Sequence, residues 1–316
     1  MSAILEMLQT AAEMGLIEGL TVLALFLSYS MLGVCDLSTD GCFTLGAVVG
    51  AVVALAGHPW LSILAAMLAG ISSGFVTAFL QTRMGINSLL AGIIVNTALY
   101  SVNIAILGGS SLINLNKADT VFSFFRSVLG ENGKSYAVLL VALIAVALAT
   151  AFLVLFLKTR LGLAVRATGN NADMVKSSSI NPIFTTTVGL CVSNAFTALS
   201  GCLLAQSQKG ANINIGSGLV TVALASLLIG GTFIRRGGLL VKALGVVLGS
   251  IIFRLVYSLA LSLDMPAYML KAVSSIIVIL AISLPYLKEK FPEFRRKIEH
   301  SPLGKKLKHK GDTNDA

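Results

Sequence analysis

The stretch KTRLGLAVRATGNNADMVKSSSINP, residues Lys158–Pro182, is a polar island between two long apolar segments. Tyr136–Leu157 precedes the island, Ile183–Ala205 follows it, and neither segment contains a charged residue. A helix needs about 20 apolar residues to cross the hydrocarbon core of a bilayer. Each flank is therefore long enough to span a membrane, and the island must lie at one membrane surface.

The charges of the island predict which surface this is. One acid, Asp173, stands against four basic residues, which are Lys158, Arg160, Arg166 and Lys176. Lys and Arg are enriched in the cytoplasmic loops of membrane proteins. We therefore expect the island to lie inside the cell.

A short helix is predicted within the island. Asn170 or Asn171 can cap its start, and the helix extends to about Ser177. Asp173 falls in the first turn and Lys176 near the end, where the helix dipole favours each sign of charge. We expect this helix to be the place where another protein exerts force on the membrane domain.

The composition of the whole chain is that of a membrane protein. Of its 316 residues, 56% are hydrophobic and only 12% are charged, which is too apolar for a soluble domain. The net charge of +9 does not indicate nucleic-acid binding, because no basic patch is interleaved with stacking aromatic residues. The sequence predicts an all-α, polytopic membrane protein.

Nine apolar segments follow one another along the chain, and some of them are expected to be broken or re-entrant. They are Leu16–Val34, Phe43–Ala56, Leu61–Leu80, Ile86–Leu107, Tyr136–Leu157, Ile183–Ala205, Leu219–Ile234, Leu239–Tyr257 and Met269–Leu287. The segments 43–56 and 219–234 are short. Irregular backbone at membrane depth persists only where protein or a water-filled cavity satisfies its polar groups, so short segments indicate a transport path.

Three regions are predicted: an amphipathic lead at 1–15, a transmembrane permease domain at 16–287 and a basic cytoplasmic tail at 288–316. Nine segments place the amino end outside and the carboxyl end inside. The basic residues then divide unequally: the inside holds nine in the tail together with Arg83, Lys158, Arg160, Arg166, Lys176, Arg235, Arg236 and Lys242, whereas the outside holds Lys117, Arg126, Lys134 and Lys209.

The sequence offers little material for an enzyme. The three histidines lie in a tight link and in the tail, and the four cysteines lack the spacing of metal ligands. There is no Gly-rich loop ending in Gly-Lys-Ser or Gly-Lys-Thr, so this chain is not expected to bind ATP. We predict no catalytic residues, no cofactor and no metal site, and we expect any ATP hydrolysis to occur in a separate subunit.

The turn CDLSTDG, residues Cys35–Gly41, holds the most notable polar residues near the apolar zone. Asp36 and Asp40 could line a solute path at a helix break. Alternatively, the turn is a hydrated inside loop in which Asp36 caps the next helix.

Polar stripes on two spans leave a similar choice. Asn96, Tyr100 and Asn103 share one helical face, and a second stripe consists of Ser193, Asn194, Thr197 and Ser200. Such stripes face either other helices, through hydrogen bonds, or a cavity; two facing stripes would suit a neutral or zwitterionic solute. Arg254 and Lys271, basic residues inside apolar runs, either extend to the membrane surface or, for Arg254, meet a solute carboxylate.

Together with the island and CDLSTDG, the run LIGGTFIRRGG at Leu228–Gly238 resembles the permease subunits of bacterial ABC importers, in the family serving branched-chain amino acids, ribose and similar solutes. The similarity covers about residues 16–287 and is strongest to a branch linked to aromatic amino acids. Members often have Gly-Ile-Asn where this chain has Ser179-Ile180-Asn181, and they have no equivalent of Thr39 and Asp40, so the solute stays open among amino acids, sugars and nucleosides.

The resemblance implies a permease subunit that works by alternating access in the bacterial plasma membrane. It implies an ABC ATPase subunit, an external solute-binding protein and a second permease subunit, with a homodimer expected. The residues expected to couple the permease to the ATPase are Arg166, Gly169, Asn170, Asp173 and Met174, with Met174 as an apolar knob in an ATPase groove. The alternative is a secondary transporter or channel that works alone.

Overall fold

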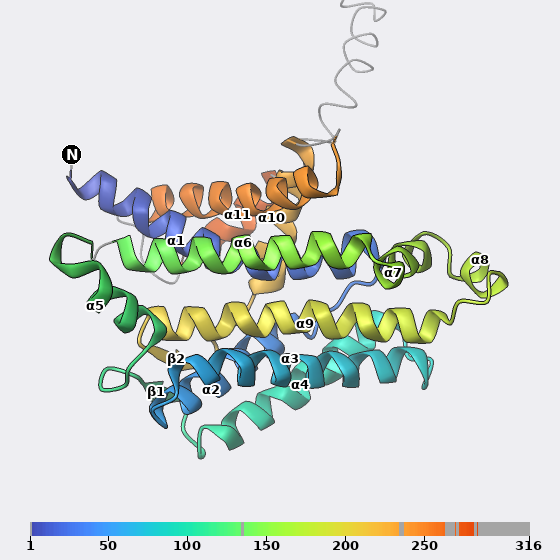
Figure 1. The fold of residues 1–316 in the computed structure, drawn as a ribbon, viewed down its shortest axis with the longest axis horizontal. Helices are drawn as coiled ribbons and strands as arrows, with labels where there is room; N and C mark the ends of the chain where they lie inside the picture. Colours follow the sequence, from blue (N-terminus) through green and yellow to red (C-terminus); the bar gives the residue numbers. More distant parts are fainter. Residues whose placement is uncertain are drawn as a thin grey trace, which may run out of the picture.

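The computed structural model describes residues 2–133, 136–233, 237–262, 269, 272–280 and 283. Within these residues the chain is almost entirely helical (Figure 1). Its helices are α1 Ser2–Leu25, the π-helical η1 Phe26–Met31, α2 Thr39–Leu55, α3 Pro59–Thr82, α4 Ser88–Ile106, α5 Val121–Gly133, α6 Ala137–Lys158, α7 Arg160–Asn170, α8 Ala172–Ser177, α9 Pro182–Ser207, α10 Leu219–Phe233 and α11 Leu239–Leu261.

The prediction of an all-α polytopic fold is confirmed. In the described part of the chain, six helical segments are long and apolar enough to cross a membrane: Leu5–Met31, Pro59–Thr82, Ser88–Ile106, Ala137–Lys158, Pro182–Ser207 and Leu239–Leu261. The two short predicted segments correspond to the shorter apolar helices α2 and α10. Residues 272–280, within the ninth predicted segment, are also helical, so nine is an approximate count.

The amino-terminal lead and the first predicted span form one continuous helix. α1 has no break near residue 15 and passes directly into η1. The apolar helical segment that is long enough to cross a membrane extends over Leu5–Met31 and includes Leu16, where the first span was predicted to start. Within an unbroken helix the backbone N–H and C=O groups bond to one another. A break would leave several of these groups without helical partners.

Polar side chains in the loops specify several helix starts. Asn87, Thr159 and Asn181 accept hydrogen bonds from backbone N–H groups in the first turns of α4, α7 and α9. These bonds satisfy donors that a helix start leaves free. α9 also begins with Pro182, which lacks an N–H and whose fixed φ suits the first helical position.

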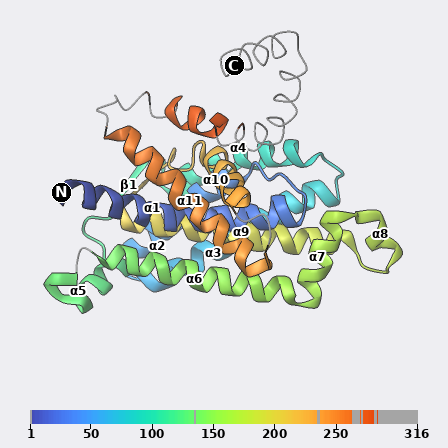
Figure 2. The same cartoon turned by 90° about the horizontal axis from the view of Figure 1, so that it is seen from above.

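Helix α9 lies at the centre of the domain, packed against α1, α2 and α3. Figures 1 and 2 show the long helices running side by side, with α9 inside the bundle. α2 and α9 approach so closely at Gly46 that a Cβ atom there would lie 2.1 Å from the carbonyl oxygen of Ala198. Only glycine allows the two backbones to pack at this distance.

Loops that are far apart in the sequence meet at the end of the bundle opposite α7 and α8 (Figure 1). Strand β1, Leu112–Asn114, pairs antiparallel with β2, Gly210–Asn212, with Ile113 opposite Ala211. The two loops predicted to lie outside, 108–135 and 206–218, therefore share one end of the molecule. Lys134, Arg235, Arg236 and the tail at 288–316, which contributed to the predicted topology, lie outside the described residues. Lys271 also lies outside them.

We expect Gly46→Ala to destabilise the domain, because the added Cβ would force α2 and α9 apart. Overpacking of this kind costs about 1–3 kcal/mol. Thermal unfolding of the detergent-solubilised protein measures the change. The matched control is Gly231→Ala in α10, where a Cβ meets no atom within 4 Å; there Ala should be neutral or stabilising, since it favours helix over Gly. Equal unfolding temperatures for the two variants would contradict this packing.

Candidate functional site

The carboxylate of Asp40 joins the starts of helices α2 and α10. Asp40 lies in the first turn of α2, and its Oδ2 and Oδ1 accept hydrogen bonds from the backbone N–H groups of Gly218 (2.9 Å) and Val220 (2.8 Å). These donors belong to the start of α10, where a helix has no internal acceptors. One side chain thus joins α2 and α10, the helices that correspond to the two short predicted segments; we call these the interrupted segments.

Asp36 lies in the non-helical segment 32–38 between η1 and α2, and it is 1% exposed. Its Oδ1 accepts from the backbone N–H (2.8 Å) and the hydroxyl (2.6 Å) of Ser38. Its Oδ2 accepts from Nδ2 of Asn194 in α9 (2.8 Å). Asp36 therefore organises the turn that leads into α2 and fixes it to the central helix.

A polar cavity of about 320 Å³ opens beside Asp40. We call it the Asp40 cavity; it is lined by Asp40, Gly41, Thr44, Asn96, Thr97, Tyr100, Asn103, Ile213, Asn214 and Ser217. Four of the six residues predicted for the substrate path, Asp40, Asn96, Tyr100 and Asn103, come together there. The other two, Asp36 and Asn194, are buried against each other and do not line this cavity.

The second polar stripe mostly joins helices. The hydroxyls of Ser193 and Ser200 in α9 donate to the backbone carbonyls of Ala24 (2.8 Å) and Ile17 (2.6 Å) in α1. These are interhelical hydrogen bonds, the first of the two alternatives that the sequence left open. The stripe that reaches a cavity is the one on α4.

A second cavity of about 320 Å³ contains an ion pair that the sequence analysis missed. We call it the Arg254 cavity; it is lined by Glu18, Ile215, Ser217, Gly218, Leu219, Thr221, Val222, Phe253, Arg254, Tyr257, Ser274 and Ser275. Arg254 of α11 pairs with Glu18 of α1. The sequence did contain a signal for this pair, namely an acid and a base inside two apolar segments. A charged side chain in an apolar segment needs a partner of opposite charge.

The island forms two helices, α7 and α8. The sequence predicted α8. α8 ends at Ser177, and the cap is Asn171, whose Oδ1 accepts from the N–H groups of Asp173 (3.1 Å) and Met174 (3.0 Å). Val175 is buried, whereas the side chain of Met174 is 68% exposed. α8 thus presents an apolar side chain away from the protein.

Helix α7 contacts the end of η1, where the non-helical segment 32–38 begins. A Cβ atom at Gly169 would lie 2.2 Å from the carbonyl oxygen of Met31, the last residue of η1. The hydroxyl of Thr168 bonds to that of Thr185 in α9 (2.7 Å). Of the predicted coupling residues, Gly169 makes this close contact, Arg166 is half-buried in α7, and the other three are exposed; these are Asn170, Asp173 and Met174.

This arrangement defines a class of protein. Long apolar helices, two interrupted segments around polar cavities and an exposed short helix at one end describe a polytopic membrane permease. The sequence matches the profile of the family described as "Branched-chain amino acid transport system / permease component" over residues 7–282. The chain belongs to this family.

Three relatives are named for their transport systems. The chain is 34% identical to the tyrosine transport system permease protein of Clostridioides difficile (strain R20291), over 84% of this chain and 86% of the relative. It is 27% identical to the D-allose transport system permease protein AlsC of Escherichia coli (strain K12), over 81% and 76%. It is 29% identical to the galactose/methyl galactoside import permease protein MglC of the same strain, over 69% and 63%.

The resemblance seen in the sequence is thereby confirmed. The protein is the permease subunit of an ABC importer, a multi-pass protein of the bacterial inner membrane. It is a transport protein and not an enzyme, and ATP is hydrolysed by a separate ATPase subunit. An ATPase and a solute-binding protein are the partners that this family requires.

We predict that Asp36 and Asn194 are energetically coupled. A hydrogen bond to a charged group contributes about 1.5–3 kcal/mol, so the effects of Asp36→Ala and Asn194→Ala on unfolding should be non-additive by about that amount. Unfolding of both single variants and the double variant in detergent gives the coupling energy. In a control cycle, Ser250→Ala replaces Asn194→Ala; Ser250 bonds to Gly15 elsewhere, so its effect should add to that of Asp36→Ala. Additive effects for Asp36 and Asn194 would contradict the bond.

Proposed function

We propose that this permease imports an aromatic amino acid by alternating access through the Asp40 cavity. The observation that carries the proposal is the position of this cavity at the junction of α2 and α10. Transporter binding sites typically lie near the bilayer midplane, where interrupted helices expose polar groups. Asp40, Asn96, Tyr100 and Asn103 would then be residues of the solute path.

The lining of the cavity suits such a solute. It offers amides and hydroxyls with a single carboxylate, Asp40, whose oxygens already accept two backbone N–H groups. Neutral hydrogen-bonding groups of this kind match a solute without net charge. The relative named for tyrosine transport covers more of this chain than the two relatives named for sugars, which favours an amino acid.

Coupling is proposed to occur through α7 and α8. Met174 would insert into a groove of the ATPase. Arg166, Asn170 and Asp173 would contact the ATPase surface around that groove. Movement of α7 would reach Met31 through the close contact at Gly169 and then pass into segment 32–38. That segment carries Asp36 and leads to Asp40, so the island is connected to the cavity by a continuous chain of contacts.

We further propose a homodimer with the amino end outside and the carboxyl end inside. Among the described residues, those at the α7–α8 end include Arg83, Lys158, Arg160, Arg166 and Lys176, whereas the loops around β1 and β2 carry Lys117 and Lys209. Basic residues favour the cytoplasmic side. The α7–α8 end would therefore face the ATPase and the β1–β2 end the solute-binding protein.

Reconstitution tests the proposed function. The tagged chain is purified from its native membrane with its co-purifying ATPase and binding protein, and the complex is placed in liposomes. We expect ATP-dependent uptake of radiolabelled L-tyrosine and no comparable uptake of D-galactose. Galactose uptake alone would replace the amino-acid proposal with a sugar, and uptake by the permease without ATPase or ATP would contradict the importer mechanism.

Replacing Met174 with Glu should uncouple transport from ATP hydrolysis, because a charge on the apolar knob opposes burial in the ATPase groove. We expect transport to fall at least about tenfold, since burying an uncompensated charge costs well over 1.4 kcal/mol. Uptake and solute-stimulated ATP hydrolysis are measured on the same proteoliposomes.

Met174→Leu is the matched control, because Leu keeps the apolar character and approximate volume of Met. It should retain coupled transport. Solute-stimulated ATP hydrolysis that is unchanged in Met174→Glu would show that α8 does not couple the two subunits in this way.

A further inference from the structure

The ion pair between Glu18 and Arg254 lies deep inside the membrane domain. Glu18 is midway along the apolar segment Leu5–Met31, and its side chain is 3% exposed. Arg254 lies within the span Leu239–Leu261. Ionisable residues at such depth are rare and usually mark a substrate pathway or a proton relay.

The pair is two-pronged. Nε of Arg254 donates to Oε2 of Glu18 (2.6 Å), and Nη2 donates to Oε1. A guanidinium has five N–H donors, and the bonds to Glu18 use two of them. The ring of Tyr257 lies 5.3 Å from the guanidinium carbon, which holds the cation by a cation–π interaction independently of Glu18.

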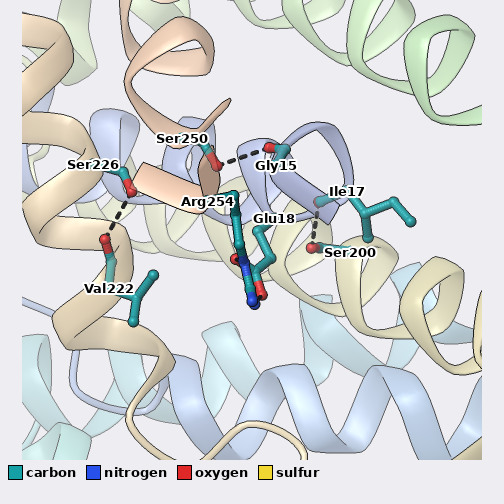
Figure 3. A network of polar contacts seen from close by, with 8 residues as sticks. All are labelled: Gly15, Ile17, Glu18, Ser200, Val222, Ser226, Ser250 and Arg254. Carbon is teal, nitrogen blue, oxygen red and sulfur yellow. Dashed lines mark hydrogen bonds and ion pairs between the residues drawn. The ribbon is translucent and has the colours of Figure 1, made fainter. Parts of the chain in front are cut away.

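The contact between α1 and α11 does not depend on this pair. The hydroxyl of Ser250 donates to the carbonyl oxygen of Gly15 (2.7 Å) one turn away, and Figure 3 shows this bond beside the pair. At Gly15 the helices approach so closely that a Cβ would lie 2.8 Å from Cα of Ile251. A buried ion pair adds little to helix packing that is already this close.

The Arg254 cavity gives the pair room to act on a ligand. Its volume of about 320 Å³ is at the lower end of the range for small-molecule sites. Arg254 is the more accessible partner, with 24% of its side chain exposed. Ser217 lines both this cavity and the Asp40 cavity, so the loop 213–218 separates two adjoining polar spaces.

We propose that Glu18 and Arg254 form a binding site for the zwitterionic head of an α-amino acid. The solute carboxylate binds the guanidinium of Arg254, and the solute ammonium binds the carboxylate of Glu18. This inference rests on the proposed function, since it assigns the amino-acid class of the solute to particular residues.

Charge balance explains why a zwitterion is suited to this site. A ligand with one charge would occupy one member of the pair and leave the other buried without a partner, which is unfavourable in a membrane domain. A zwitterion brings both charges, so that one ion pair becomes two and no charge is left unpaired. A neutral sugar cannot compete with the closed pair, so the same arrangement selects against it.

Binding to the purified permease–ATPase complex, without the solute-binding protein, tests the site. Tritiated L-tyrosine is the probe, and unlabelled L-tyrosine, L-tyrosinamide and N-acetyl-L-tyrosine compete with it. The amide lacks the carboxylate and the acetyl derivative lacks the ammonium group. We expect each derivative to compete at least about tenfold more weakly than L-tyrosine, because a site built for a polar group rejects analogues that lack it.

The double variant Glu18→Gln with Arg254→Gln should reduce this discrimination to within about twofold or abolish L-tyrosine binding. Ser250→Ala, which removes a neighbouring bond between the same helices, should keep wild-type discrimination. Wild-type discrimination in the double variant, or equal competition by all three compounds in the native complex, would overturn the proposal.

Two results separate this inference from the proposed function. If the double variant does not assemble with the ATPase, Arg254→Lys replaces it. Loss of the forked guanidinium should lower the affinity for L-tyrosine and leave the affinity for L-tyrosinamide unchanged. An unchanged affinity for L-tyrosine would overturn the site. If the native complex imports L-tyrosine but its preference for L-tyrosine over the two derivatives does not depend on Glu18 and Arg254, the proposed binding site is wrong and the proposed function stands. Absence of any amino-acid uptake by the native complex refutes the proposed function.

Discussion

The structure depends on how backbone groups are satisfied where the short apolar helices α2 and α10 begin inside the membrane domain. A helix start leaves N–H groups without acceptors, and the hydrocarbon core offers no water to bind them. Here Asp40 supplies both of its carboxylate oxygens to the start of α10, and Asp36 supplies its own to the turn before α2 and to Asn194. Interrupted helices, with the polar cavities beside them, are stable because these two acids are present.

The same bonds connect distant parts of the domain. Asn194 belongs to the central helix α9, Asp36 and Asp40 flank the start of α2, and Gly218 and Val220 begin α10. At the other end of segment 32–38, Met31 contacts Gly169 of α7. These contacts would allow a displacement of the α7–α8 surface to reach both cavities. This route is the physical basis of the coupling proposed above between a separate ATPase and the solute path.

The sequence predicted whatever depends on local chemistry. Uninterrupted apolar runs predicted the spans. The order of an asparagine, Asp173 and Lys176 predicted a short helix ending near Ser177, with the cap open between Asn170 and Asn171, and the cap is Asn171. The stripe of Asn96, Tyr100 and Asn103 could be placed on one face, and it lines a cavity. Features that require tertiary contacts were not predictable: that Asp36 turns toward Asn194, that β1 pairs with β2, and that Glu18 meets Arg254. Each joins segments whose proximity follows from packing of the whole bundle.

In the proposed mechanism, the α7–α8 surface moves as one unit with the segments that begin α2 and α10. Hydrogen–deuterium exchange of the reconstituted complex measures this directly, by comparing nucleotide-free and ATP-trapped states in peptides covering 31–42 and 213–222. We expect the backbone amides in both peptides to change protection together, including those of Gly218 and Val220, which donate to Asp40. Identical exchange in the two states, or a change in only one of the peptides, would contradict it.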